Sequence, residues 1–325
     1  MAKNKSVYAF EEADSKNRML LGGKGAGLSE MTRLRLPVPP GFTITTEVCN
    51  NYYDNGKKLP KDVMPSVMKN IAKMEKKTGK KWNSTKNPLL VSVRSGAAIS
   101  MPGMMDTILN LGLNEKTVEG FAQQTKNPRF SWDSYRRFIQ LFGKVVFGVN
   151  DEKFDHVLDS AKNKQGVTDD SKLNVESLKK IVSEYKKICE THTKRKFPDT
   201  PNEQLGLAIE AVFKSWMGER AVVYREKNGI TKDIANGTAV NVVTMVFGNM
   251  GDDSATGVVF TRNGHNGKRE IEGEYLINAQ GEDVVAGVRT GKNVDLLKKE
   301  MPKSHKELSN ACARLEKHFR EPQDI

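Results

Sequence analysis

The sequence lacks the features that would fix a membrane location or a disulfide framework. Its three cysteines, Cys49, Cys189 and Cys312, form no Cys-x-x-Cys pair, so neither a zinc ribbon nor a dithiol redox motif is expected. No apolar run approaches the ~20 residues that cross a bilayer, and no secretory or transit segment begins the chain. No repeat with a period of 20–50 residues occurs. These absences favour an intracellular protein with reduced cysteines and no membrane partner.

Length and charge narrow the choice of partner. With 325 residues, the chain is long enough for about two domains. Lys and Arg number 52 against 40 Asp and Glu, which gives a net charge of +12. Such a surplus favours an anionic partner: nucleic acid, acidic lipid or a phosphorylated small molecule. Nucleic-acid binding also calls for aromatic side chains interleaved with the basic ones, and Trp82 and Phe197 are too few.

The order of hydrophobic patterns predicts an α/β fold (α+β) of two lobes with a helical insertion. A glycine-rich turn and a helix come first, followed by strands at 42–46 and 89–93. Helical spacing then dominates from 112 to 197, and Thr200 begins a further helix. Strands at 239–246, 257–262 and 274–277 form an antiparallel-looking sheet before a last helix at 301–320. The predicted parts are 1–111, 112–197 and 198–325.

Two segments of the first part have residues suited to an anionic ligand. The run Gly22–Gly27 precedes a helix, where glycines let backbone N–H groups approach phosphate. Its spacing matches neither common phosphate loop, so a purely structural turn stays open. Arg94 is expected at the C-terminal end of a buried strand, facing a ligand crevice or forming a surface ion pair. The methionines that follow, at 101–105, suit a flat purine, a partner domain or the protein's own core.

Longer motifs resemble the pyruvate phosphate dikinase family over nearly the whole chain. The sequence blocks that carry the resemblance are 21–28, 90–97, 100–112, 127–130 with 133–138, 237–248 and 273–290. The related phosphoenolpyruvate synthases share the Arg94-Ser95 turn but lack the loop at 100–106.

This resemblance implies an ATP-grasp nucleotide-binding domain. In the family, that domain transfers a pyrophosphoryl group from ATP to a histidine on a separate domain and releases AMP. Inorganic phosphate splits that group, and the remaining phosphoryl passes to pyruvate on a further domain. The parent reaction is therefore ATP + phosphate + pyruvate giving AMP + pyrophosphate + phosphoenolpyruvate. The parent is expected to be a homodimer and not to bind nucleic acid.

The resemblance also assigns roles to single residues. Lys24 and Arg94 are expected on the ATP phosphates, where they would act in catalysis. Asp324 is expected to bind Mg²⁺, weakly, because a chain end frays. The other residues expected to contact the nucleotide are Gly103, Met105, Met245, Val246, Thr256 and Glu282.

We expect the chain to be a piece of a longer protein, because the family's phosphohistidine motif and pyruvate-binding domain do not appear in it. Alone it should bind ATP poorly and turn nothing over. The default compartment is the cytoplasm, with a plastid or a microbody such as the glycosome or peroxisome open for the parent. Two alternatives stay open: a phosphoenolpyruvate synthase-like dikinase, and a non-catalytic basic module that binds nucleic acid with steep salt dependence.

Overall fold

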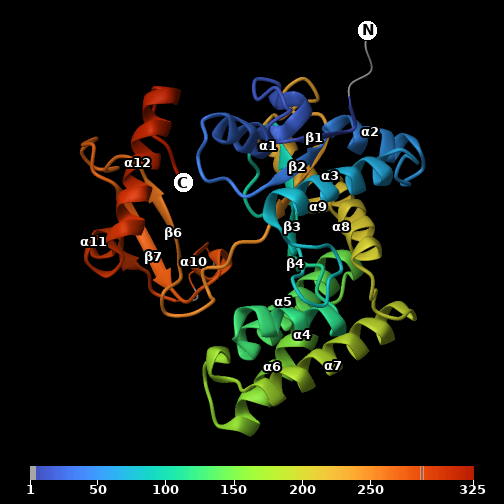
Figure 1. The fold of residues 1–325 in the computed structure, drawn as a ribbon. Helices are drawn as coiled ribbons and strands as arrows, with labels where there is room; N and C mark the ends of the chain where they lie inside the picture. The colour runs from blue at the N-terminus through green and yellow to red at the C-terminus, as the bar shows by residue number, and fades with distance from the viewer. Residues whose placement is uncertain (1–4, 286, 288) are drawn as a thin grey trace. The chain divides into compact units, whose positions relative to one another are not determined.

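The computed structural model of the chain describes residues 5–285, 287 and 289–325, apart from the side chains of Glu282 and Val285. It divides into two compact units, Met1–Met245 and Val246–Ile325. Each unit combines helices with an antiparallel sheet, so the expected mixed α/β class is confirmed (Figure 1). The three predicted parts within the chain stay a prediction. Within the described residues, no helix is both long and apolar enough to cross a membrane.

The first unit is built on a five-stranded sheet in the order β1-β2-β5-β3-β4, in which every pair is antiparallel. Its strands are β1 (Val7–Ala9), β2 (Gly41–Ile44), β3 (Val91–Ala97), β4 (Thr107–Leu111) and β5 (Thr238–Thr244). The central strand β5 comes last in the chain, and all seven of its residues are buried. The sheet therefore pairs two strands from before residue 100, β2 and β3, with a strand that comes more than 130 residues later in the chain.

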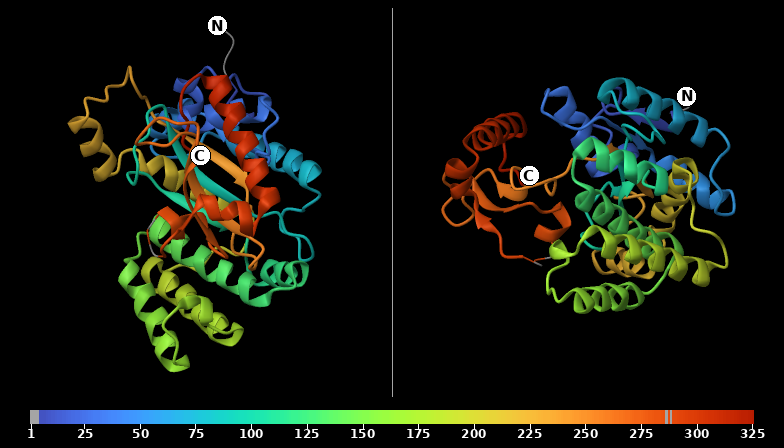
Figure 2. Two further views of the ribbon diagram at one scale, coloured as in Figure 1. Left: turned by 90° about the vertical axis from the view of Figure 1, so that its left-hand side faces the viewer. Right: turned by 60° about the horizontal axis from the view of Figure 1, so that its bottom comes forward.

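The helices of the first unit either pack on this sheet or form a bundle beside it. Helix α1 contacts β2, β3 and β5, and α8 contacts β3, β4 and β5. Helices α4 to α7 form the helical insertion between β4 and β5, gathered beside β4 in Figures 1 and 2. The helices are α1 (Arg18–Arg33), α2 (Thr46–Asp54), α3 (Val63–Thr78), α4 (Glu115–Thr125), α5 (Pro128–Phe147), α6 (Asp151–Gln165), α7 (Val175–Thr193), α8 (Pro201–Ser215) and α9 (Glu219–Lys227).

Helix α5 shows how the sequence defines this insertion. Pro128 occupies the first turn, and the Asn127 side chain accepts a hydrogen bond from the N–H of Phe130 at the N-terminus. Gly148, at a φ of 69°, ends the helix in the left-handed conformation that glycine adopts without strain. Between these ends, Phe138 and Phe142 are fully buried and their rings lie 5.4 Å apart.

The second unit has a three-stranded antiparallel sheet in the order β6-β7-β8. It comprises β6 (Ala255–Phe260), β7 (Glu272–Ile277), α10 (Gly281–Val285), β8 (Lys292–Asn293), α11 (Leu297–Glu300) and α12 (Pro302–Phe319). A small core joins sheet and helices through Val259, Tyr275, Val294, Leu297 and Cys312.

Three features differ from the expectations. Arg94 lies in the middle of β3, not at a strand end, because pairing with β5 continues through Ala97. The strand expected at 239–246 ends at Thr244 and belongs to the first sheet, between β2 and β3. The lysine-rich stretch after residue 46, for which no helix was predicted, forms α2 and α3. The lysines of α3 are partly or fully exposed, whereas Val67 and Ile71 of the same helix are buried.

A buried ion cluster stabilises the insertion. The Asp133 carboxylate is 4% exposed and accepts from Arg136 at 2.5 Å and from Arg137 at 3.2 Å, while Arg136 also reaches Asp170 at 2.8 Å. Burial alone would raise the pKa of Asp133, but these guanidinium groups outweigh it and hold the pKa at about 2. A pKa lowered by folding adds stability above the unfolded value of 3.8, and that stability is lost as pH falls toward 2.

We predict that Asp133→Ala lowers the free energy of unfolding by about 3–5 kcal/mol at neutral pH, because the buried Arg136 and the half-buried Arg137 both lose their contact with this carboxylate. Urea unfolding followed by tryptophan fluorescence measures this, since Trp82, Trp132 and Trp216 all belong to the first unit. The matched control is Asp159→Ala, whose exposed pair with Lys162 is worth less than about 1 kcal/mol. Equal losses in the two variants would contradict the assigned role of the cluster.

Candidate functional site

A glycine turn interrupts helix α1 and lies directly on strand β3. Gly22 has φ 69° and ψ 165°, a conformation essentially reserved for glycine, so the helix restarts after it. A Cβ atom at Gly22 would lie 1.8 Å from the carbonyl oxygen of Gly96. The two backbones are therefore in direct contact, and no side chain fits between them.

This contact brings Lys24 close to β3. The Cβ of Lys24 lies 3.4 Å from the position that a Cβ on Gly96 would take. The pKa of Lys24 is lowered to about 8, first by burial of its amine and then by the nearby positive charge of Arg94. The residue taken as a whole is exposed. Among the described residues, no hydrogen bond or ion pair holds the Lys24 ammonium.

Arg94 lies on the same face of the sheet as the glycine turn. It is half-buried, opposite Asn241 of β5 and Thr107 of β4. Directly opposed residues share a sheet face, and so do residues two apart, which puts Arg94, Asn241 and Gly96 together. Thr43 of β2 also opposes Asn241 and belongs to this face. The structure thus brings the two predicted cations together from segments 70 residues apart.

Two neighbouring cations beside a helix N-terminus suit an anion. Burial of the amine is the larger cause of the lowered pKa of Lys24, and repulsion by Arg94 is the smaller one. An anion between the two cations would relieve that repulsion. The guanidinium of Arg94 can bind two oxygens, and the ammonium acts as a point charge. An arrangement of this kind can bind a phosphate-type group and neutralise its charge.

The methionine–glycine loop is attached to the same strand. The N–H of Ser95 donates to the carbonyl oxygen of Asp106 at 3.3 Å, and Arg220 of α9 reaches the carbonyl oxygen of Gly103 at 3.5 Å. Gly103 is exposed at a φ of 71°, and Met105 is half-buried. Both predicted loop residues therefore follow the strand that carries Arg94.

Met245 is the last predicted site residue of the first unit. It follows β5, its N–H donates to the carbonyl oxygen of Leu90 at 2.9 Å, and its side chain is buried.

The other predicted residues belong to the second unit. Val246, its first residue, is 69% exposed. Thr256 pairs with Leu276 and lines a cavity of about 270 Å³ whose other walls include Val259 and Tyr275. Glu282 lies in α10, and its side chain is outside the described part of the structure.

Asp324 is held by the backbone around it. The N–H of Val259 donates to the carbonyl oxygen of Ile325, and that of Thr261 donates to Gln323, each at 2.9 Å. The backbone at Asp324 thus pairs with Phe260 along the edge of β6. The expected fraying of this residue is wrong, because strand pairing extends to the last residue.

Comparison with known proteins identifies the family. The family model for "Pyruvate phosphate dikinase, AMP/ATP-binding domain" matches residues 18–59 and 55–309. A pyruvate, phosphate dikinase of Entamoeba histolytica is 53% identical over 98% of this chain and 36% of its own length. One of Clostridium symbiosum is 52% identical over 99% of the chain and 37% of its own length. The chain belongs to this family.

The chain spans about a third of the length of the curated relatives that it matches. Among them is a pyruvate, phosphate dikinase of Arabidopsis thaliana named chloroplastic, 48% identical over 99% of this chain and 33% of its own length. Membership of the pyruvate phosphate dikinase family agrees with the resemblance drawn from the motifs.

Magnesium was expected at Asp324. Within the described residues, no group of three or more His, Cys, Asp or Glu side chains could hold a metal ion. A dedicated protein cage for Mg²⁺ is therefore not formed by these residues. A single carboxylate fits only an ion that takes most of its oxygen ligands from nucleotide phosphates and water, which is the common mode for Mg²⁺.

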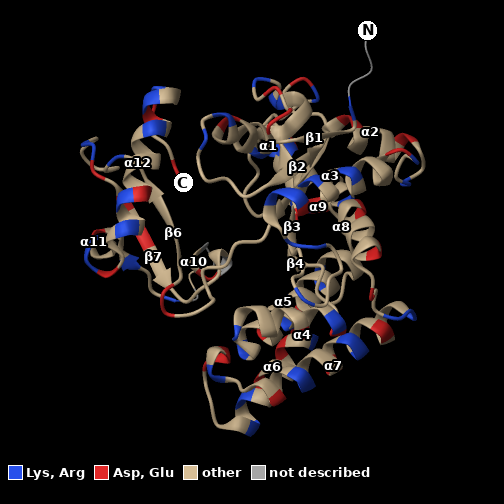
Figure 3. Cartoon of the chain, in the orientation of Figure 1, with Lys and Arg blue, Asp and Glu red and all other residues tan. Residues whose placement is uncertain are grey.

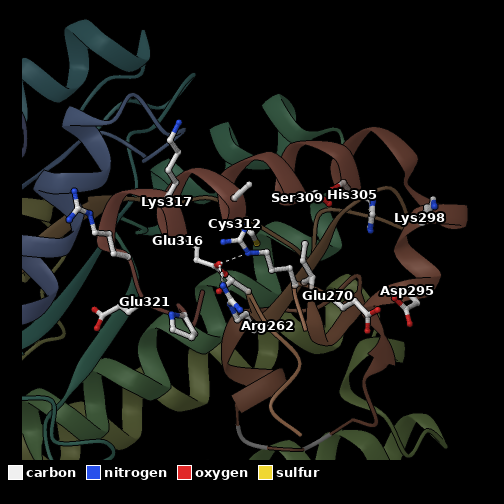
Figure 4. Close-up of a pocket in the computed structure, with 16 residues that line it drawn as sticks. Arg262, Glu270, Asp295, Lys298, His305, Ser309, Cys312, Glu316, Lys317 and Glu321 are labelled. Atoms are coloured by element: carbon white, nitrogen blue, oxygen red, sulfur yellow. Dashed lines mark hydrogen bonds and ion pairs between the residues drawn. The ribbon is translucent and has the colours of Figure 1, made fainter. Parts of the chain in front are cut away.

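Another cavity of the second unit has a different character. It measures about 1030 Å³, and both basic and acidic side chains line it (Figure 4). Glu316 accepts from Arg262 at 2.7 Å and pairs with Arg269 at 3.4 Å, so one carboxylate is shared by two arginines. Thr256 and Asp324 do not line it. Figure 3 shows a similar mixture of basic and acidic residues along α7 and α12.

Thr43 and Asn241 lie beneath the glycine turn, and the sequence motifs do not predict either of them as part of the site. The Thr43 hydroxyl donates to Asn241 Oδ1 at 2.8 Å, and both residues are completely buried. The available signal was a polar amide within the apolar run at 239–246. The amide matters for the site because β5 is the central strand of the sheet, and the apolar run at 239–246 does not by itself specify that place.

We predict that Gly22→Ala lowers the free energy of unfolding of the first unit by about 3 kcal/mol or more, because its Cβ overlaps Gly96 and its φ is strained. Tryptophan fluorescence during urea unfolding measures the loss. The control is Gly27→Ala in the same helix, where the added Cβ meets nothing within 4 Å. This variant should raise the free energy of unfolding by about 0.5–1 kcal/mol, because alanine favours the helix more than glycine does. A Gly22→Ala protein as stable as the parent would refute the close contact.

Proposed function

We propose that this chain binds ATP, as the magnesium complex, and is the nucleotide-binding part of a dikinase. The observation that supports this most is the pair Lys24 and Arg94: a glycine turn in α1 brings Lys24 beside Arg94 of β3. The chain's membership of the pyruvate phosphate dikinase family also supports it. In the parent protein, ATP would give a pyrophosphoryl group to a histidine on another domain. Phosphate and pyruvate would then receive its two phosphoryl groups, one each.

The role proposed for Lys24 and Arg94 follows from the chemistry of that transfer. Phosphoryl-type transfer depends on alignment and on neutralising charge over the phosphate oxygens, more than on a covalent contribution from the protein. Arg94 would hold two oxygens in a fixed orientation, and Lys24 would neutralise charge on an adjacent phosphate. Both side chains would thus orient the group toward its acceptor.

The remaining assignments are proposals of the same kind. Gly103 and Met105 would contact the nucleotide, and Met245 and Val246 would line the adenine. Thr256 and Glu282 would make polar contacts with it. Asp324 would be the protein's ligand to the Mg²⁺ ion that accompanies ATP.

We further propose that the 325 residues alone do not complete the reaction. Their partners would be the phosphohistidine and pyruvate-binding domains of the parent, which we propose to be a homodimer. AMP formation that depends on pyruvate in a solution of this chain alone would refute this proposal.

We predict that Arg94→Ala weakens MgATP binding by at least about 10-fold, because a hydrogen-bonded charge contact is worth about 1.5–3 kcal/mol. Titration of the 325-residue chain with MgATP, followed by two-dimensional NMR, measures even weak binding. The control is Arg195→Ala, at an exposed position in the helical insertion, which should leave the affinity unchanged. Equal affinities for the parent and Arg94→Ala would remove Arg94 from the site.

We also predict a pH dependence from Lys24. With a pKa of about 8, its ammonium is charged below that pH and neutral above it. The affinity for MgATP should therefore fall as pH rises from 7 to 9, and Lys24→Gln should abolish this fall. A pH dependence that persists in Lys24→Gln would point to another group.

A further inference from the structure

The amide of Asn241 is an unusual choice for its position. Asn241 is completely buried in the central strand β5, with β2 on one side and β3 on the other. Its Oδ1 accepts from the Thr43 hydroxyl at 2.8 Å, whereas its Nδ2 has no hydrogen-bond partner in the described part of the chain. A buried donor without a partner is unfavourable, so an apolar residue would be the better choice for stability alone.

The amide instead fills the space between the glycine turn and β3. A Cβ on Gly25 would lie 2.9 Å from Asn241 Oδ1 and 2.7 Å from the Thr43 hydroxyl oxygen. A Cβ on Gly96 would lie 2.6 Å from Asn241 Nδ2 and 3.4 Å from the Cβ of Lys24. Helix α1 and β3 are thus both fitted to this amide, and each has a glycine at the point of contact.

We propose that Asn241 is a positioning residue for the phosphate site: its amide, fixed by Thr43, spaces the glycine turn from β3 and keeps Lys24 beside Arg94. The proposal rests on the proposed function for its biological meaning, but the geometry it describes exists without ATP. Asn241 itself is too deeply buried to touch a ligand. It acts through Lys24.

The position of Lys24 can be read from its titration. The charged group that acts on the Lys24 amine is Arg94 on β3. The guanidinium of Arg18, at the start of α1, lies 3.2 Å from the position that a Cβ on the neighbouring Gly23 would take. If Asn241→Ala lets the turn relax, the amine gains water and moves from Arg94. Its pKa should then rise from about 8 toward the ordinary 10.5.

The experiment follows the Lys24 amine by NMR in protein with labelled lysine side chains, using Lys24→Gln to assign the signal. We expect a clear rise of its pKa in Asn241→Ala and the same direction in Thr43→Val, which keeps the shape but removes the hydrogen bond. The control is Asn70→Ala in α3, another buried asparagine, whose side chain donates to the carbonyl oxygen of Ser66. That variant should leave the Lys24 titration unchanged.

A second pair of variants tests the contact itself. Gly96→Ala places a methyl group against Asn241 Nδ2, so it should destabilise the first unit and disturb Lys24. In the double variant Gly96→Ala with Asn241→Ala, the new methyl enters the space that the amide leaves. The loss of stability should therefore be smaller than the sum of the two single losses.

The outcomes separate this proposal from the proposed function. A shifted Lys24 titration together with about a 10-fold loss of MgATP affinity in Asn241→Ala supports both. A shifted titration in a protein that does not bind MgATP supports the positioning role and refutes the ATP site. If Lys24 titrates identically in the parent, Asn241→Ala and Thr43→Val, all folded, the positioning role is wrong.

Discussion

The backbone contact between Gly22 and Gly96 is the constraint on which the rest of the site depends. At this point helix α1 and strand β3 touch without an intervening side chain. Only glycine fits on the helix side, because of both the contact and the positive φ. Because of this contact, helix α1 restarts after Gly22 and Lys24 lies close to Arg94. A side chain at Gly22 would separate the two cations.

The sheet order explains why such a contact forms between distant parts of the sequence. Strand β5 pairs with β2 and β3 at once, so Thr43, Arg94 and Asn241 meet on one face. Pairing on both sides of β5 fixes the register of these three residues relative to one another. The site is therefore a property of the folded first unit and not of the glycine turn alone, since an isolated turn would not bring Arg94 near Lys24.

The sequence predicts the local features of this site and misses those that depend on strand pairing. The glycine run, the helix after it and the importance of Arg94 are visible in short motifs. The central place of the strand at 239–246 is not, because one apolar run pairs equally well with many neighbours. For the same reason Asn241 looked unremarkable in sequence. The helix at α3 was missed because its many lysines hide the spacing of Val67, Ile71 and Met74.

In the second unit too, the sequence predicts the strands but not all of their pairing. The alternation at 257–262 and 274–277 identified β6 and β7, and their antiparallel pairing is as expected. The pairing of Gln323 and Ile325 with β6 was missed, since three residues carry no periodicity. The roles of Thr256, Glu282 and Asp324 rest on the family resemblance alone.

The central claim is that Lys24 is held beside Arg94 to receive the phosphates of ATP. The most direct measurement is the rate at which an amine-specific reagent modifies Lys24 near pH 8, read by peptide mass spectrometry with and without MgATP, with the exposed Lys57 as internal reference. We expect rapid modification of Lys24 that MgATP suppresses, while the rate at Lys57 does not change. Equal modification of Lys24 at saturating and zero MgATP would show that the phosphates of ATP do not bind beside it.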